Sequence, residues 1–469
     1  MFKLTLTCVL IVLTDSASAQ QIDYALRSTA AFEMDGRRDL GLAGGGTDNN
    51  AFLNLAPRLL IELSPRWTGY VRARVFLPTG RVAPFDSDEP DNPNPAKSFA
   101  GLNEFWIQYN GFTSYPGEAL RIGRQHIRQN GSEWWDQDAD AVRWIFDTTR
   151  LSAESGVARQ FSTYRTDSAD VPIAQRDRAY LFANVSADWR PENRVGLRIT
   201  HAVDDVDLPQ PGAPVAPDEK LRDAQLTWLG VYADNGFYNI RGAEKRFAYG
   251  SEINYLTGSQ DIAQRGSGGT VATLSSQDVS AWHASAGARW HPFSKAPVLF
   301  GAAYTYSEGG GSSSRSQQYQ QTGMQSNSSY FAGTQTLTGR YNETLKAELG
   351  NLLVTTAFVS LNLPRNDASL IFSTFRRDSG ASPIVTDNVT VAPVNSSRDI
   401  GAGLDLVLTH YLQRDHRQQR LLDRGDAFTA RPRLSLISLR GSMFRPGDAY
   451  GSAARTDYRI LLELTLWRD

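Results

Sequence analysis

The chain has 469 residues and a net charge of −2, with 48 Lys and Arg against 50 Asp and Glu. This balance excludes the basic footprint of a general nucleic-acid-binding protein. No stretch beyond the N-terminus approaches the roughly 18–20 consecutive apolar residues of a membrane-spanning helix, and the mean hydropathy is only −0.38. Any membrane role is therefore left to segments that are apolar on one face, as the strands of a barrel are.

The N-terminus predicts a secretory signal over residues 1–19. Lys3 precedes an apolar run at 4–13, and Ala17-Ser18-Ala19 supplies small residues for cleavage. The single cysteine, Cys8, lies inside this signal, so the mature chain has neither a disulfide nor thiol chemistry. We expect residues 20–469 to form one domain.

Apolar and polar residues alternate along much of the mature chain, for example in 71–77, 181–189 and 459–466. This period predicts β-strands with one apolar and one polar face. We expect about 18 antiparallel strands of roughly ten residues or more, which form a single transmembrane β-barrel in the bacterial outer membrane. One strand, over residues 340–363, is expected to be long.

Short and long connections alternate between these strands, as the two rims of an outer-membrane barrel require. The short ones are 64–66, 112–118, 147–150, 190–193, 234–236, 291–296 and 364–367. The long ones are 36–50, 78–99, 129–138, 164–177, 204–221, 259–278, 308–337 and 378–398.

Aromatic residues fall near many strand ends, which is typical of interfacial girdles. They are Trp67, Tyr70, Phe105, Trp106, Trp134, Trp135, Trp189, Trp290, Tyr411 and Trp467.

Four connections need separate interpretation. Residues 412–430 are long and charged although they fall on the short-turn rim, so they either cover the periplasmic mouth or form a solvated loop. The loop 78–99 is a second candidate for folding inward. The Gly-rich run 308–314 lacks the lysine of a phosphate loop and indicates a flexible extracellular loop. Residues 86–91 are rich in Asp, but interleaved prolines favour a solvated loop over a Ca²⁺ site.

Seven runs in order resemble the alginate export porins of the bacterial outer membrane. The runs are RDLG (38–41), EFWIQY (104–109), YPGEALRIGRQ (115–125), FSTYRTD (161–167), QLTWLG (225–230), QQTGMQSNSSYFAGT (320–334) and FRPGDAYG (444–451). The resemblance implies an 18-stranded barrel with a positively charged pore through which a polyuronate leaves the cell. It also implies that an inward outer loop and a periplasmic loop gate this pore, at 78–99 and 412–430.

The resemblance also implies residues that line the pore. Matching basic positions are Arg124, Arg165, Lys346, Arg440 and Arg459, with acidic companions Glu104, Asp136 and Asp167. Other lining positions that carry arginine in the family are here Ala56, Asn103, His126, Leu337 and Ser438, which dilutes the positive ring. The chain also ends on Asp469, where outer-membrane barrels usually end on an aromatic residue.

Strand alternation adds further candidates. Arg72 and Arg74 share one face, and Ile122, Arg124, His126 and Arg128 share another. Guanidinium groups suit bidentate contact with carboxylates, and each such contact in a pore is weak enough to let a polymer move on. Alternatively, these arginines pair with acidic residues across the lumen, namely Glu104, Asp136, Asp167, Asp188, Glu348 and Glu463.

Enzyme chemistry finds little support. The six histidines are scattered, without an HExxH motif or paired metal-ligand spacing, although a Ser-His pair involving His201 or His410 stays open. We predict a passive, monomeric channel without cofactor or metal, which secretes an anionic exopolysaccharide, most simply alginate, with help from periplasmic secretion components. A diffusion porin for small anionic solutes or for a less charged polymer is the alternative.

Overall fold

The structure is a computed structural model of the chain, and it describes residues 21–36, 38–80, 97–129, 131–216, 218–239, 245–266, 268–292, 297–414 and 434–468. The predicted signal lies outside these ranges, as do most of 78–99 and 412–430. Within the described ranges, no helix is long and apolar enough to cross a membrane.

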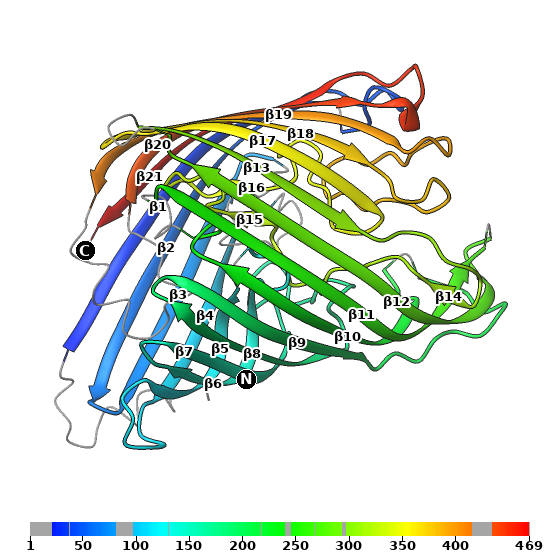
Figure 1. Ribbon diagram of the computed structural model, residues 1–469. Helices are drawn as coiled ribbons and strands as arrows, with labels where there is room; N and C mark the ends of the chain where they lie inside the picture. The colour runs from blue at the N-terminus through cyan, green and yellow to red at the C-terminus, as the bar shows by residue number, and fades with distance from the viewer. Residues whose placement is uncertain are drawn as a thin grey trace.

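Eighteen long antiparallel strands form one closed barrel (Figure 1). They are β1 (Gln21–Asp35), β2 (Asp48–Ser64), β3 (Trp67–Pro78), β4 (Phe99–Tyr109), β5 (Glu118–Arg128), β6 (Asp136–Asp147), β7 (Leu151–Arg159), β8 (Arg178–Arg190), β9 (Asn193–Asp204), β10 (Arg222–Asp234), β11 (Phe247–Arg265), β12 (Val271–Trp290), β13 (Val298–Ser307), β17 (Leu352–Asn362), β18 (Asn366–Arg376), β19 (Asp399–Arg414), β20 (Leu434–Pro446) and β21 (Asp457–Arg468). β1 pairs with β21, so the sheet closes without a free edge. The predicted fold class and strand number are confirmed.

The remaining elements are short. β14 (Arg315–Ser316), β15 (Ser328–Ser329) and β16 (Thr338–Gly339) all lie in the connection between β13 and β17. A 3₁₀ turn, η2 (Asp448–Tyr450), lies in the connection between β20 and β21.

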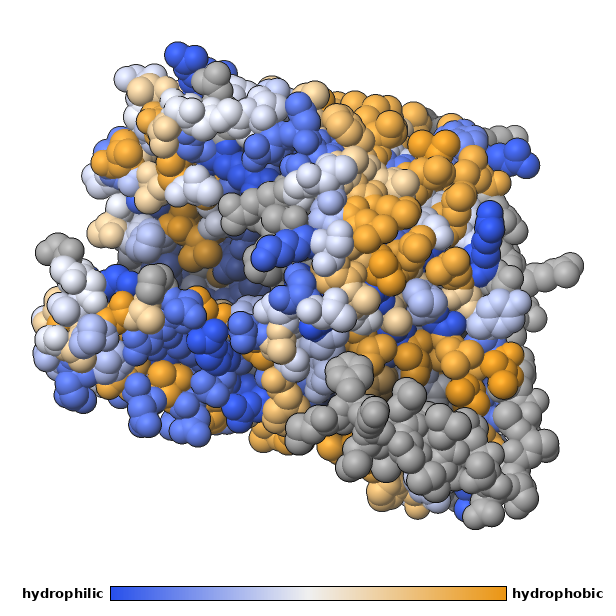
Figure 2. Space-filling view, turned by 180° about the vertical axis from the view of Figure 1, so that it is seen from behind, coloured by the Kyte–Doolittle hydropathy of each residue, from blue (hydrophilic) through white to orange (hydrophobic). Residues whose placement is uncertain are grey.

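Side chains along the strands alternate between the lipid face and the lumen. On β8, Leu181, Val185 and Trp189 are exposed, whereas Phe182 and Ser186 are buried inside the barrel. The exposed members are apolar because they face hydrocarbon, where an unpaired polar group is costly. Figure 2 shows apolar residues over much of the outer surface in view and hydrophilic residues gathered toward one end.

Short and long connections alternate around the barrel. We name the end that carries the links 65–66, 191–192 and 363–365 the short-turn rim, and the opposite end the long-loop rim. In outer-membrane barrels the short turns face the periplasm. The predicted alternation holds at most positions.

Two connections differ from the prediction. The link after β10 spans 235–246, which is longer than the predicted turn at 234–236. The predicted long loop at 259–278 is mostly strand, because β11 and β12 stay paired as far as Arg265↔Val271 and leave only 266–270 between them. Its many Ser, Thr and Gln residues suggested a loop, but a strand that rises above the membrane also tolerates polar residues on both faces.

The connection between β13 and β17, residues 308–351, folds into the barrel, and we name it the luminal loop. Near the long-loop rim, its strand β14 pairs with β12. Further along, the Gln335 N–H donates to Asp367 Oδ2 (2.7 Å). Asp367 is the second residue of β18 and lies beside the short-turn rim. The loop then returns, and the Glu348 N–H donates to the Val385 carbonyl (3.0 Å) on the long-loop side. The loop therefore runs the length of the lumen twice.

This course corrects two predictions. The long strand expected at 340–363 begins only at Leu352, and the preceding residues belong to the luminal loop. The Gly-rich run 308–314 is the ordered start of this loop, since Gly311 bridges to Ser316. Alternation misled the prediction because parts of the loop, such as 335–340 and 345–349, also alternate between buried and half-buried side chains.

The end of the β5–β6 hairpin, residues 124–140, also leaves the wall, and we name it the hairpin end. β4 pairs with β5 only as far as Phe105↔Arg124, and beyond that point Gly101 of β4 bridges to Arg165. The segment that carries Arg165 thus closes the wall where β5 has left it. Gly123 adopts φ +124° at the departure, and a Cβ there would lie 2.4 Å from the Phe105 carbonyl oxygen, so this bend requires glycine.

The hairpin end and the luminal loop together fill the lumen beside β8 to β13, which we name the filled half. Trp135 packs against Tyr180 and Phe182 with ring centroids 5.1 and 4.9 Å apart, and its Nε1 donates to Thr200 Oγ1 (3.1 Å). Leu345 of the luminal loop belongs to the same buried apolar cluster. The side that faces β1 to β4 and β19 to β21 carries mostly polar residues, although the same buried cluster reaches Ile400 of β19 and Phe444 of β20. We name this side the polar half.

The expected aromatic girdle is only partly formed. Trp67, Trp189 and Trp290 are exposed on the outer face. Trp134, Trp135 and Tyr411 are buried, and register places three more inside the barrel: Tyr70, Trp106 and Trp467. Sequence position near a strand end does not show on which face an aromatic side chain lies.

Candidate functional site in the lumen

Charged residues of the hairpin end meet inward-facing residues of β3 and β4. Arg72 lies between two carboxylates, with its Nε 3.0 Å from Glu104 Oε1 and its Nη2 3.0 Å from Asp138 Oδ2. The Asn103 side-chain amide also donates to Asp138 (3.3 Å). These contacts attach the hairpin end to the wall and neutralise Arg72.

His126 and Arg128 extend this cluster toward the luminal loop. The ring nitrogens Nδ1 and Nε2 of His126 lie 2.9 Å from Asp138 Oδ1 and Asp136 Oδ1, respectively. The backbone N–H of His126 donates to Glu104 Oε2 (3.0 Å). Arg128 Nη1 is 3.5 Å from Asp136 Oδ2, and its Nη2 donates to the Ser328 carbonyl (3.0 Å). We name Arg72, Glu104, His126, Arg128, Asp136 and Asp138 the ion-pair network.

The network faces the wall because the hairpin end has bent inward. By strand alternation, His126 and Arg128 share a face with Ile122, which is 47% exposed to the outside, yet both are buried. As predicted, these residues share one face of β5 by alternation. Only the bend at Gly123 brings that face inside the barrel.

Arg124 and Arg165 lie at the wall closure near the long-loop rim. Arg124 Nη1 is 3.5 Å from Asp140 Oδ2, and its guanidinium lies 5.0 Å from the Tyr164 ring centroid. Arg165 donates through Nε to Asp167 Oδ1 (2.9 Å) and covers the Phe99 ring at 3.9 Å. Both cations therefore have an acidic partner close by.

A second set of charges lies where β1, β20 and β21 meet the luminal loop. Arg459 is fully buried and donates through Nη2 to Glu33 Oε1 (2.7 Å). Its Nη1 also donates to the Glu343 carbonyl (3.4 Å), while Arg440 Nη1 lies 3.8 Å from Glu343 Oε1. The structure thus brings Arg440 and Arg459 together around Glu343.

Lys346 and Glu348 of the luminal loop lie beside this set, next to Asp387 of the β18–β19 connection. Burial lowers the pKa of Lys346 to about 8; Arg459 acts in the same direction, while Glu343 and Asp387 oppose it. Burial and the neighbouring carboxyl of Asp387 together raise the pKa of Glu348 to about 8. Both groups therefore change charge in the same pH range.

Arg74 lies apart from both sets, with its side chain directed at wall residues. Its Nε donates to Asn54 Oδ1 (3.0 Å), and its guanidinium covers the Phe76 ring at 4.6 Å. The predicted residues therefore fall into separate places along the polar half rather than into one ring.

The acidic residues expected to pair with arginines behave in two ways. Besides Glu104, Asp136 and Asp167, Asp188 also contacts an arginine, with its Oδ1 3.0 Å from Arg194 Nε. Glu348 instead shares a hydrogen bond with Asp387, and Glu463 accepts one from Thr465 (2.8 Å).

Sequence reasoning missed the anchors of the filled half. Glu133 accepts hydrogen bonds from Arg340 and from the Tyr341 hydroxyl (2.7 Å), which joins the hairpin end to the luminal loop. Arg289 of β12 donates to four backbone carbonyls, those of Gly236, Phe237, Tyr330 and Phe331. Strand alternation alone marks Arg289 as inward, and no motif marks its partners.

The described part of the chain contains no group of three or more side chains suited to hold a metal ion. The Asp-rich segment 86–91, and the predicted gates at 78–99 and 412–430, lie entirely or mostly outside the described residues.

Comparisons with known proteins decide the family. A model of the family described as alginate export matches residues 20–459. The chain belongs to the alginate export family. The protein named alginate production protein AlgE from Pseudomonas aeruginosa is 36% identical, covering 93% of this chain and 90% of the relative. The protein of the same name from Azotobacter vinelandii is 31% identical, covering 94% of this chain and 92% of the relative. As a member of this family with a closed barrel, the chain is an outer-membrane protein.

Solved structures agree on the fold of this alginate export family member. Pseudomonas aeruginosa OccK8 (OprE) matches with a TM-score of 0.55 at 10% identity, covering 97% of this chain and all of the other. OccK2 (OpdF) in complex with glucuronate matches with a TM-score of 0.53 at 10% identity, over 96% and 99%. At this identity the likeness concerns the barrel alone.

Proposed function

We propose that this protein is a passive channel that exports alginate across the outer membrane through the polar half of its lumen. The family match over residues 20–459 carries this assignment, because a relative that matches 93% of the chain is named for alginate production. We further propose that residues 1–19 are removed, and that the barrel acts as a monomer that receives polymer from periplasmic secretion components.

The residues proposed to line the path are basic groups interspersed with acidic ones. They are Arg74, Arg124, His126, Arg128, Arg165, Lys346, Arg440, Arg459, Glu104, Asp136 and Asp167. One cation about 6 Å from a carboxylate in water gains only about 0.7 kcal/mol, so several such groups in series attract a polyanion without trapping it.

Ion pairing gives a second candidate some support. Because Arg72, Arg128 and Arg459 each lie against a carboxylate, the net positive field in the polar half is smaller than the number of arginines suggests. A pore with a modest field favours small anionic solutes or a less charged polymer. The two functions differ in whether a long oligouronide occupies the channel.

An enzymatic role has a geometric argument against it. Ser307 Oγ lies 2.8 Å from His283 Nδ1, and His283 Nε2 lies 3.5 Å from Glu133. This order of side chains resembles a Ser-His-Glu catalytic triad. Both Ser307 and His283 are 0% exposed, so a substrate carbonyl has no approach to the hydroxyl. These groups connect β12 and β13 to the hairpin end. His201 and His410 hydrogen-bond to Thr227 and Asn366 instead of to a serine.

Single-channel recording tests the assignment. The purified barrel in a planar bilayer is expected to prefer Cl⁻ over K⁺ in a salt gradient and to be blocked transiently by a hexameric oligouronide but not by a neutral hexasaccharide. Removing Lys346 and Arg440 charge (Lys346→Met with Arg440→Gln) is expected to weaken oligouronide block by about tenfold, which corresponds to about 1.4 kcal/mol. Absence of oligouronide block in the unmodified protein would favour the small-solute porin.

A further inference from the structure

Planar side chains from five strands form a strip across the inner wall of the polar half. Its members are Trp467 on β21, Arg58 on β2, Tyr70 on β3, Trp106 on β4 and Arg121 on β5. Register places them on the lumen side: Arg58 is opposite Arg72, Tyr70 is opposite Trp106, and Trp467 is opposite Arg27. We name these five residues the aromatic strip.

Rings and guanidinium groups are interleaved along the strip. The Arg58 guanidinium lies 4.7 Å from the Trp467 ring centroid. The Tyr70 and Trp106 rings are stacked, with centroids 5.2 Å apart, and the Arg121 guanidinium covers Trp106 at 3.9 Å. Gln108 fixes Arg121 from the side by accepting hydrogen bonds from its Nε (3.0 Å) and Nη2 (2.7 Å). Such contacts hold flat surfaces in place before any ligand arrives.

Arg58 differs from the arginines of the ion-pair network. Among the described residues it has no ion pair, and its Nε has no hydrogen-bond partner. Arg72, directly across the strand pair, is bound by both Glu104 and Asp138. Arg58 is partly exposed, with its Nε buried, and it lacks the carboxylate partners that hold Arg72.

The strip also has a defined position along the path. Tyr70 and Trp106 each lie two residues beyond the ion-pair network on the side of the short-turn rim, which is about 7 Å along a strand. Since short turns face the periplasm, a polymer that leaves the cell meets Tyr70 and Trp106 before it meets Arg72 and Glu104.

We propose that the aromatic strip is a uronate-binding subsite at the periplasmic side of the channel. The apolar C–H face of a pyranose ring packs on the lumen-facing edges of the Trp106 and Tyr70 rings, and its carboxylate pairs with the Arg58 guanidinium. Flat rings orient a sugar unit without a directional hydrogen bond, so the chain slides from one unit to the next. This subsite rests on the export function and specifies where that function first engages its substrate.

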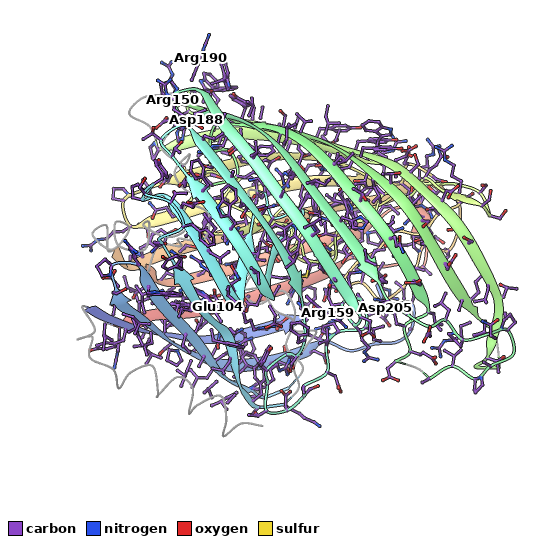
Figure 3. The ribbon with its side chains drawn as sticks, turned by 90° about the horizontal axis from the view of Figure 1, so that it is seen from below. Glu104, Arg150, Arg159, Asp188, Arg190 and Asp205 are labelled. Atoms are coloured by element: carbon purple, nitrogen blue, oxygen red, sulfur yellow. The ribbon has the colours of Figure 1, made fainter. Side chains whose placement is uncertain are left out.

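The test compares the unmodified protein with four variants in planar bilayers, with oligomer added on the short-turn side. The variants are Arg58→Gln, Arg58→Lys, Trp106→Leu and, as a matched control, Arg190→Gln. The Arg190 guanidinium also covers a tryptophan ring, that of Trp189, at 4.7 Å. Trp189 faces the lipid, however, and Arg190 lies at the short-turn rim, away from the aromatic strip (Figure 3). A hexameric oligouronide and a neutral hexasaccharide are the probes, and the heat-dependent shift of the folded band in SDS reports that each barrel has folded.

Arg58→Gln is expected to shorten the oligouronide block by about tenfold, and Arg58→Lys, which keeps the charge but loses the planar fork, by less. Trp106→Leu is expected to shorten it by a similar factor, whereas Arg190→Gln leaves it unchanged. Block that is strong in the unmodified protein and equally strong in folded Arg58→Gln and Trp106→Leu would overturn the subsite while the export function stands. No block in the unmodified protein would overturn both.

Discussion

The two halves of the lumen are built by different physical means. In the filled half, Trp134, Trp135 and Trp228 are completely buried among apolar side chains, as in the core of a soluble protein. In the polar half, charged groups such as Arg72 and Arg459 are held by carboxylates. The barrel therefore contains a packed apolar core on one side and paired charges on the other.

This difference separates stability from selectivity. Apolar burial in the filled half contributes about 25 cal/mol for each Å² removed from water, whatever ions are present. Under the proposed export function, charges in the polar half set which solutes pass, and their effect responds to pH and salt. Changes in one half should therefore alter properties that changes in the other half leave intact.

The largest effect is expected from Glu133→Ala in the filled half. This change leaves the buried Arg340 without its carboxylate, and such uncompensated charges cost about 3–5 kcal/mol. The luminal loop should detach, so that single-channel conductance rises severalfold and protease cuts within 308–351, while the barrel still resists SDS. Glu192→Ala is the control, since the Glu192 side chain, which pairs with Lys245, is 74% exposed. Unchanged conductance in Glu133→Ala would contradict the anchoring role.

A second strong effect is expected from Trp135→Ala. Removal of a buried tryptophan leaves a cavity that typically costs about 3 kcal/mol or more. We expect a lower temperature for loss of the folded band in SDS, with unchanged ion selectivity. Trp189→Ala, on the lipid face, should have a much smaller effect. Equal effects of the two changes would mean that the filled half has no packed core.

In the polar half, Arg72→Gln should change selectivity rather than stability of the barrel wall. Glu104 and Asp138 then lose their shared cation, and the lumen gains one net negative charge. Reversal potentials in a KCl gradient should shift toward cation preference, more at low than at high salt. Arg194→Gln, which frees Asp188 near the short-turn rim, serves as the control. A shift of the same size in the control would argue against the ion-pair network as the selective region.

The smallest effect is expected from pH. Lys346, whose pKa is about 8, is charged below that pH, and Glu348, whose pKa is also about 8, is neutral below it. Raising the pH from about 6.5 to about 9.5 therefore removes one positive charge and adds one negative charge, and anion preference should fall through this range. Lys346→Met with Glu348→Gln should flatten the profile, and a profile that stays equally steep would assign the titration to other groups.

The wall of the barrel follows from local sequence, and its interior does not. Alternation on β3, β8 and β21 predicts which side chains face lipid, because hydrocarbon imposes the same demand along every strand. The positions of Trp134 and Trp135 depend on the bend at Gly123, and that bend has no local pattern beyond one glycine. Likewise, the course of the luminal loop depends on pairs such as Glu133 and Arg340, which lie far apart in the sequence.

The same limit applies to the candidate site. The basic positions suggested by the family resemblance do occur in the lumen region, but their partners could only be found from distances. The resemblance gave no reason to single out Arg58, and the aromatic residues of the strip were expected at the membrane boundary. Inward or outward orientation of Tyr70 and Trp106 depends on register between strands, and register is a property of pairs of segments.

The bridge between Gly101 and Arg165 has a practical consequence for anyone who would use the barrel as a sensing pore. Because this bridge closes the wall behind β5, the outer shell does not depend on the hairpin end for its continuity. The hairpin end can then be shortened, or exchanged for another recognition segment, without opening a gap in the wall toward the bilayer. The chain thus combines a continuous barrel wall with an internal hairpin end that can be replaced independently of it.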